Sequence, residues 1–306
     1  MALVEERLKG IALDSPGRLG AACVATLSAG GKRVRPLLTL LSARTDRELG
    51  EPLARAAAAV ELLHMATLVH DDVLDDAELR RGRPTVAKEF GLDVAVSAGN
   101  FLLARAFSEL AGTGDAAAVA ALRAAAVGLS KGEVLQRDQT RVVTLARADY
   151  ERRCERKTAD LFAVSCRLGA CLSGAGEESV AALAEYGRLI GLAFQVFDDI
   201  LDCNGEEADT GKRLGADVRD GTITLPLLFA LEAEPGLGKL LARDDLSAEE
   251  VATVLRTVAQ SGALPRARAV AMRYIEDASG VLTTCPGPVE RELLAQAAAQ
   301  VVARFS

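Results

Sequence analysis

The 306-residue sequence contains no tryptophan, only 4% aromatic residues, two histidines and nine prolines. None of these prolines falls between Pro84 and Pro226. Long stretches rich in alanine and leucine that no proline interrupts favour helices, which pack closely through small side chains. Alternating apolar and polar runs bounded by tight turns, which are typical of strands, do not stand out. The sequence therefore predicts an all-α protein.

Acidic residues outnumber basic ones: the sequence has 43 Asp and Glu but only 36 Lys and Arg, which gives a net charge of −7. We expect no nucleic-acid partner, because such partners need a basic surface.

The six cysteines form no CxxC pair and only two histidines accompany them, which argues against zinc and for reduced thiols in a cytoplasmic protein. Acidic residues near the amino-terminal end do not fit a signal peptide. No apolar stretch approaches the roughly 18 residues of a membrane span, so we expect no membrane anchor.

Helical patterns divide the chain at its Gly- and Pro-rich points, and no linker separates two halves. We therefore predict one domain over residues 1–306. The expected helices cover residues 1–29 with a break near Asp14, then a helix from Pro36, and residues 52–76, 85–111, 115–138, 147–173 and 177–203. A long loop over residues 204–221 and three or four further helices complete the expected pattern.

Two acidic clusters dominate the polar residues: HDDVLDD at positions 70–76 and FDDILD at positions 197–202. Each contains DDxxD, so its first and last aspartates lie one turn apart on the same face of a helix. Like charges about 4 Å apart repel by about 1 kcal/mol in water and about 4 kcal/mol at a protein-like effective dielectric. One such cluster is common on a solvated face, but two within apolar stretches indicate a cation site. Carboxylate oxygens favour magnesium, which substrate phosphates often complete.

Basic residues occur close to both clusters and at two further points. The segments are GGKRVRP at positions 30–36, RRGRPT at 80–85, KT at 157–158 and GKRLGAD at 211–217. Each alone is typical of surface charge, but together they fit a diphosphate, to which Arg binds through two hydrogen bonds and Lys as a point charge. His64 shares a helix face with Asp71 and is expected to contact the ligand. For His70, packing and binding remain equally open.

These motifs, in this order and spacing, resemble the trans-type polyprenyl diphosphate synthases, over about residues 20–300. The resemblance implies a single large helical bundle around a central cavity, usually in a homodimer. It also implies a prenyltransferase that joins isopentenyl diphosphate head to tail to an allylic diphosphate.

The resemblance further implies a role for each matching residue. Two or three Mg²⁺ ions would be held by Asp71, Asp72, Asp75, Asp198 and Asp199, with Asp202 assisting directly or through water. The allylic diphosphate would be bound by Arg80, Lys157 and Lys212, and isopentenyl diphosphate by Lys32, Arg35, His64 and Arg81. Thr158 and Gln195 would lie beside the reacting carbons and steady the developing cation.

Two positions depart from the family pattern. Thr222 stands where relatives usually carry lysine, which would weaken one diphosphate contact, and Asn100 stands where aspartate is common. We find no physical account of the second difference in the sequence.

Product length is expected to depend on the residues before the first acidic cluster. In the family a bulky aromatic four or five residues before the first aspartate closes the channel, whereas here these residues are Thr67 and Ala66. Because burying each methylene is favourable by about 0.8 kcal/mol, an open channel predicts a product of about six to eight isoprene units. Leu63 and Val60, further down the helix, are the candidate floor.

Three alternatives remain. The product could be shorter, as in a farnesyl or geranylgeranyl diphosphate synthase. A terpene cyclase or head-to-head condensing enzyme also uses Asp-rich helices, but cyclases surround their cations with aromatic residues that this chain lacks. A non-catalytic partner subunit would have no need to keep two repulsive acidic clusters.

Overall fold

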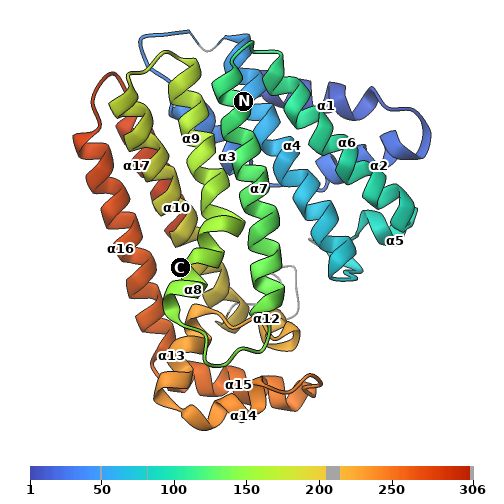
Figure 1. Ribbon diagram of the computed structural model, residues 1–306, viewed down its shortest axis with the longest axis vertical. Helices are drawn as coiled ribbons and strands as arrows, with labels where there is room; N and C mark the ends of the chain where they lie inside the picture. Colours follow the sequence, from blue (N-terminus) through green and yellow to red (C-terminus); the bar gives the residue numbers. More distant parts are fainter. Residues whose placement is uncertain (49, 81, 205–213, 304–306) are drawn as a thin grey trace.

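A computed structural model describes residues 1–48, 50–80, 82–204 and 214–303 of the chain. Almost all of its regular structure is helical, as the sequence predicted. Long helices make up most of the bundle: α4 (Glu51–Leu74), α6 (Leu92–Ala111), α7 (Ala116–Asp138), α9 (Asp160–Leu172), α10 (Glu177–Asn204) and, at its edge, α16 (Ala263–Thr284). In Figure 1, α4, α7 and α10 all run downwards from the upper edge of the molecule. Their carboxyl-terminal halves therefore share one end of the bundle.

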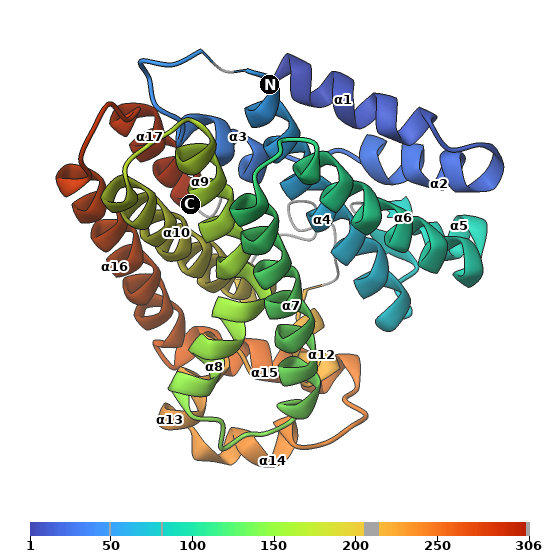
Figure 2. The same cartoon turned by 45° about the horizontal axis from the view of Figure 1, so that its top comes forward.

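Shorter helices complete the bundle. On one side lie α1 (Ala2–Leu13), α2 (Gly17–Ser28) and α5 (Val86–Phe90), whereas α3 (Val34–Leu41) packs against α4 and α9. At the lower end and on the opposite side lie α8 (Arg147–Cys154), α12 (Ala216–Asp220), α13 (Leu225–Ala233), α14 (Gly238–Leu241), α15 (Ala248–Gln260) and α17 (Arg291–Ala303), with a 3-10 turn, η2 (Pro235–Leu237). Figure 2 shows α1 and α2 beside α6, on the side of the bundle away from α16 and α17.

Caps and proline residues mark where several helices begin. The Asp115 carboxylate accepts a hydrogen bond from the Ala118 backbone N–H (2.9 Å) at the start of α7. Ser247 and Glu250 form a reciprocal capping box at the start of α15. Pro226 occupies the first turn of α13, where a missing N–H costs no hydrogen bond. The expected break near Asp14 is confirmed, since it separates α1 from α2.

Two expected helices and one expected connection differ in detail. The segment 85–111 is two helices, α5 and α6, which are separated at Gly91. Residues 147–173 include a π-helical turn, η1 (Glu155–Ala159), between α8 and α9. Between the expected helices 52–76 and 85–111, the chain forms an antiparallel pair of short strands, β1 (Leu79–Arg80) and β2 (Arg83–Pro84). A helical period cannot reveal strands of two residues.

The core is built largely from alanine, leucine and valine in two clusters. One cluster surrounds α4 and α6, and the other surrounds α10, α13 and α16. Ala56, Ala57, Ala58 and Ala59 are all fully buried, so this part of α4 is enclosed on every side. All six cysteines are free thiols, and five of them are buried.

The expected absence of a membrane-length apolar segment needs correction. Both α4 and α10 are long and apolar enough to cross a membrane by length and composition. The uninterrupted apolar runs in these helices are short, but their mean hydropathy is high despite a few acidic residues. In the structure 72% of the apolar window of α4 and 56% of that of α10 are buried inside the bundle, as in core helices of soluble proteins.

Candidate active site

The two acidic clusters lie at the carboxyl-terminal ends of α4 and α10 and face a common cavity of about 330 Å³. Asp71 in α4 and Asp75, which directly follows α4, line this cavity on one side. Asp198 and Asp199 line it from α10. Helical spacing thus predicted which residue of the first cluster would accompany Asp71. The fold brings together two segments more than 120 residues apart in the sequence.

Two of the predicted metal ligands have other partners. The buried Asp72 carboxylate accepts a hydrogen bond from Arg80 Nε (2.6 Å) and lies beside a neighbouring cavity, which Thr26, Met65 and Arg80 also line. Both carboxylate oxygens of Asp202 accept backbone N–H groups at the start of α12, from Ala216 (2.9 Å) and Asp217 (3.0 Å). Neither side chain lines the acidic cavity.

Burial changes the acidity of two of the cavity aspartates. Desolvation raises the pKa of Asp71 to about 6, although Lys157 lowers it in part. Desolvation also raises the pKa of Asp199 to about 7, against hydrogen bonds from Tyr150 and Gln195 that favour its charged form. Buried carboxylates with raised pKa values are costly to keep charged, so a cation bound beside them would stabilise their charged form.

A chain of side-chain hydrogen bonds connects α8, η1 and α10. Thr158 Oγ1 donates to Gln195 Oε1 (2.6 Å), and Gln195 Nε2 donates to Asp199 Oδ1 (2.8 Å). The buried Tyr150 hydroxyl donates to the other Asp199 oxygen (2.6 Å). The predicted residues Thr158 and Gln195 therefore meet directly and orient one of the acidic groups.

The π turn η1 carries Lys157 and Thr158, and small residues on both neighbouring helices allow it to pack closely. A Cβ at Gly132 of α7 would lie 2.7 Å from the Lys157 backbone nitrogen. A Cβ at Gly191 of α10 would lie 2.6 Å from Cα of Ala159. Glycine is therefore needed at both positions, and single-turn π segments of this kind are frequent at functional sites.

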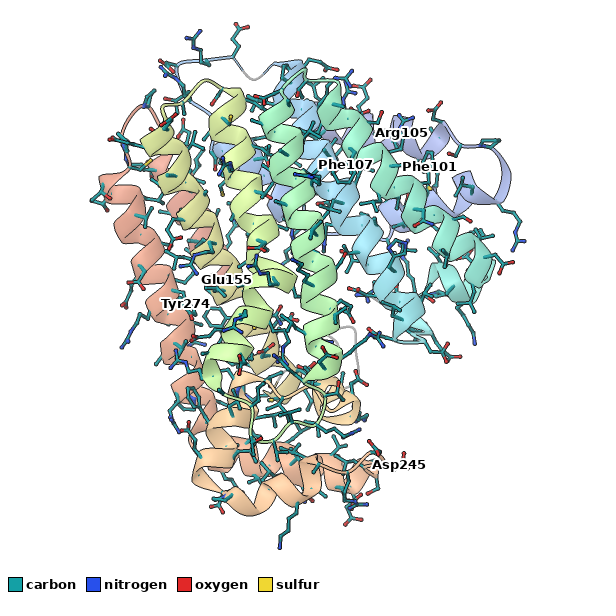
Figure 3. The ribbon with its side chains drawn as sticks, in the orientation of Figure 1. Phe101, Arg105, Phe107, Glu155, Asp245 and Tyr274 are labelled. Atoms are coloured by element: carbon teal, nitrogen blue, oxygen red, sulfur yellow. The ribbon has the colours of Figure 1, made fainter. Side chains whose placement is uncertain are left out.

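Side chains fix the same turn from both sides. The Lys157 ammonium group donates to Glu133 Oε2 (2.8 Å) and to Gln136 Oε1 (2.9 Å) on α7. On the opposite side Arg188 of α10 donates to Glu155 (2.9 Å), which is labelled at the start of the turn in Figure 3.

A second, mostly apolar cavity of about 650 Å³ adjoins the acidic one. The two share five lining residues: Leu68, Asp71, Glu133, Arg137 and Lys157. The apolar cavity lies among α4, α6, α7 and α9, and its further lining includes Leu63, Ala66, Thr67, Leu103, Ala126, Leu129 and Leu161.

The predicted channel residues on α4 fall into two groups. Leu63, Ala66 and Thr67 line the apolar cavity, and the Thr67 hydroxyl donates to the His64 carbonyl oxygen (2.8 Å) rather than into the channel. Val60 is fully buried and does not line this cavity, so it is not part of the floor seen here. Its position one turn beyond Leu63 puts it within the enclosed alanine segment of α4.

The predicted diphosphate ligands are distributed around both cavities. Arg35 lines the apolar cavity, with its guanidinium 4.5 Å from the centre of the Phe162 ring, and His64 lines the same cavity. Lys32 is exposed on the turn before α3. Arg81 and Lys212 lie outside the residues that the structure describes.

Arg33, the middle cation of GGKRVRP, has a structural role that the sequence did not reveal. Its guanidinium donates to the buried Glu61 (2.7 Å), to Glu5 (2.9 Å) and to the Leu27 carbonyl oxygen (2.8 Å). These contacts join α1, α2 and α4 around the turn that precedes α3.

Several cavity residues were missed by sequence reasoning. They are Glu133, Gln136, Arg137, Tyr150, Arg153, Asp217 and Asp220. Glu133, Gln136 and Arg137 are spaced i, i+3, i+4 and so share one face of α7, which is the only signal that could have grouped them. Arg153 is buried and donates to the Ile223 carbonyl oxygen (2.6 Å) and to Gln139 (3.0 Å).

The departures from the family pattern have different surroundings. Thr222 lines the acidic cavity and is nearly buried. Asn100 is exposed on α6, whereas Gly99 beside it packs against His70, whose Nε2 would lie 2.3 Å from a Cβ there. His70 therefore has a packing role and also lines the apolar cavity.

Comparison with known proteins identifies this arrangement. The polyprenyl synthetase family model matches residues 17–258. The chain belongs to the polyprenyl synthetase family. Component 2 of the heptaprenyl diphosphate synthase of Geobacillus stearothermophilus is 40% identical, over 96% of this chain and 92% of that protein.

Solved structures agree with this family assignment. The heptaprenyl diphosphate synthase of Staphylococcus aureus has a TM-score of 0.95 and 33% identity, and the match covers 99% of this chain and 96% of that one. A Caulobacter crescentus polyprenyl synthase, solved with calcium and isoprenyl diphosphate, has a TM-score of 0.93 and 34% identity, over 99% of this chain and 94% of that one. The chain is thus a prenyltransferase, and its all-α class is confirmed.

The side chains that line the acidic cavity of this polyprenyl synthetase fit a hard divalent cation whose coordination a substrate completes. Every acidic residue that lines the cavity offers oxygen, as Mg²⁺ and Ca²⁺ prefer. Among the described residues, no three acidic, histidine or cysteine side chains converge closely enough to hold an ion by themselves.

Proposed function

We propose that this prenyltransferase joins isopentenyl diphosphate head to tail to an allylic diphosphate and makes an all-trans polyprenyl diphosphate of about six to eight isoprene units. One observation carries the proposal: the acidic cavity lies directly beside the larger apolar cavity, and five residues line both. A diphosphate with a long hydrocarbon tail has the same two parts.

In this proposal Asp71, Asp75, Asp198 and Asp199 hold two or three Mg²⁺ ions with the allylic diphosphate. The bound ions would neutralise the charge that develops on the departing diphosphate. Asp72 contributes through Arg80, which it holds beside the cavity, and Asp202 contributes by fixing the start of α12. Lys157 and Arg80 bind the same diphosphate.

The chain's own residues protect the allylic cation that remains. Thr158 and Gln195 present oxygen atoms at the end of a fixed hydrogen-bond chain, where they can stabilise positive charge without a free nucleophile. The apolar side chains of the neighbouring cavity exclude water that would otherwise capture the cation. Arg35 and His64 at the same cavity, with Lys32, bind isopentenyl diphosphate.

Product length follows from the small residues along α4. Ala66 and Thr67 leave the cavity open, and each buried methylene of a growing chain is favourable by about 0.8 kcal/mol. The relatives from Geobacillus and Staphylococcus are both named heptaprenyl diphosphate synthases, which agrees with about seven units.

A homodimer is the proposed state of the enzyme. Exposed apolar side chains gather on adjacent helices: Leu92 and Val96 on α6, and Val127 and Val134 on α7. Val96 and Val134 also line the apolar cavity, so a second copy packed on this face would close its side. Light scattering of the purified chain would show two copies, whereas a stable monomer would favour a different partner, as the name "component 2" of the Geobacillus relative implies.

The function is tested by incubating the protein with isopentenyl diphosphate and farnesyl diphosphate, with and without Mg²⁺. We expect a diphosphate of about 35 carbons that forms only with the metal. A product that stops at 15 or 20 carbons would identify a short-chain synthase. A hydrocarbon would identify a cyclase or head-to-head enzyme, and no product would favour a non-catalytic subunit.

A further inference from the structure

Arg137 lies on α7 at the boundary between the acidic and apolar cavities. Of the described cationic residues, only Arg137 and Lys157 line both cavities. The Arg137 Nη2 atom lies 3.7 Å from Asp75 Oδ1 and donates to the Leu74 carbonyl oxygen at 3.5 Å. Its Nε lies 3.4 Å from Glu133 Oε1. About half of its side chain is exposed.

The contacts of Arg137 are longer than those of the other described cations of the acidic cavity. Arg80 lies 2.6 Å from Asp72, Lys157 makes two hydrogen bonds below 3.0 Å, and Arg153 is bound at 2.6 Å to a carbonyl oxygen. Contacts of 3.4–3.7 Å are at or beyond the limit of a hydrogen bond and are worth little for a half-exposed pair. Arg137 can therefore turn to a new anion at small cost.

We infer that Arg137 binds the diphosphate of the allylic substrate and holds it at the entrance of the apolar cavity while the hydrocarbon tail lies inside. A guanidinium group is suited to this task, because it presents parallel N–H donors to two phosphate oxygens and stays charged at every physiological pH. Its partners Asp75 and Glu133 keep it at the cavity boundary when no diphosphate is bound.

The inference rests on the proposed function, because it takes the allylic diphosphate as the ligand. A purely structural role is the competing explanation: Arg137 would only balance the charges of Asp75 and Glu133. The two differ in what is lost on substitution, since a structural residue affects stability or metal affinity and a ligand-binding residue affects the affinity for the diphosphate.

The test compares Arg137→Ala, Arg137→Lys and a control, Arg123→Ala. Arg123 is exposed on the same helix, 14 residues or about 21 Å from Arg137. Calorimetric titration with farnesyl diphosphate and Mg²⁺, without isopentenyl diphosphate, measures binding apart from turnover. Steady-state kinetics then give the two Michaelis constants, and Mg²⁺ titration without diphosphate gives the metal affinity.

We expect Arg137→Ala to weaken farnesyl diphosphate binding about tenfold, since a charge-assisted contact is lost at a partly exposed site. Arg137→Lys should recover part of this loss, and Arg123→Ala should bind as the wild type does. The Michaelis constant of isopentenyl diphosphate should stay unchanged.

An unchanged affinity for farnesyl diphosphate in Arg137→Ala would overturn the inference, and so would a loss confined to Mg²⁺ affinity or thermal stability. If Arg137→Ala does not fold, Arg137→Lys decides in its place: weaker farnesyl diphosphate binding at wild-type melting temperature supports the inference, and wild-type binding refutes it. Failure of the wild-type protein to bind or elongate farnesyl diphosphate would refute the proposed function instead.

Discussion

Replacement of Asp199 by asparagine should change how the stability of the metal-free protein depends on pH. The Asp199 side chain is almost fully buried, and burial raises its pKa from 3.8 to about 7. Between about pH 4 and pH 7 the folded protein therefore holds a proton that the unfolded chain releases. Stability must then fall as the pH rises through this interval, because the unfolded state binds fewer protons than the folded state.

The size of this loss of stability follows from the difference between the folded and unfolded pKa values of Asp199. A pKa difference of about three pH units, at about 1.4 kcal/mol each, amounts to on the order of 4 kcal/mol at pH 8. For a chain of this size, 1 kcal/mol corresponds to about 2 °C in melting temperature. Deprotonation of Asp199 should therefore lower the melting temperature by about 5–10 °C as the pH rises. Asp199→Asn has no proton to lose, and its amide can still contact Tyr150 and Gln195.

Thermal unfolding followed by circular dichroism in a chelating buffer, from pH 5 to pH 8, measures this effect. We expect the melting temperature of Asp199→Asn to fall between pH 5 and pH 8 by several degrees less than that of the wild type. Asp198→Asn is the matched control, because Asp198 is exposed one residue away and lines the same cavity. Parallel declines in the wild type and Asp199→Asn would show that the buried carboxylate is not protonated near neutral pH, and would refute the reasoning.

Three further predictions concern turnover. Asp71→Ala or Asp198→Ala should abolish turnover while the metal-free melting temperature holds or rises slightly; a large loss of helicity, measured by circular dichroism, would show that these residues are structural. Lys32→Ala and Arg35→Ala should raise the Michaelis constant of isopentenyl diphosphate, since a charge-assisted contact is worth about 1.5–3 kcal/mol; an increase confined to the allylic substrate would reverse the assignment. Ala66→Phe should shorten the product, analysed by chromatography, to three or four isoprene units, and an unchanged length would place the floor elsewhere.

The sequence predicted the long helices well because their signals are local. Proline-free runs of alanine and leucine define α4, α7 and α10, and the four-residue spacing placed Asp71 and Asp75 together. The same spacing paired Asp198 with Asp202, yet only Asp198 lines the cavity. The N–H groups of α12 bind both Asp202 oxygens, and a segment that folds back after 14 residues leaves no trace in the local pattern.

The π turn could not be predicted for a related reason. Its stability depends on Gly132 in one helix and Gly191 in another, which both lie against its backbone. In the sequence these are isolated glycines within helical patterns, where glycine alone signals only a cost of about 1 kcal/mol relative to alanine. The role of Arg33 was hidden in the same way, because its buried partner Glu61 is an acidic residue within an apolar run.

The acidic cavity links the stability of the free protein to its affinity for a cation. The low-dielectric surroundings that raise the pKa values of Asp71 and Asp199 also strengthen the attraction of their charged forms for a divalent ion. Because the ion binds only the deprotonated carboxylates, its binding must release protons below about pH 7, and its affinity must increase with pH up to that point. A divalent ion bound by these aspartates at the ends of α4 and α10 would therefore offset the instability that their burial causes in the metal-free protein.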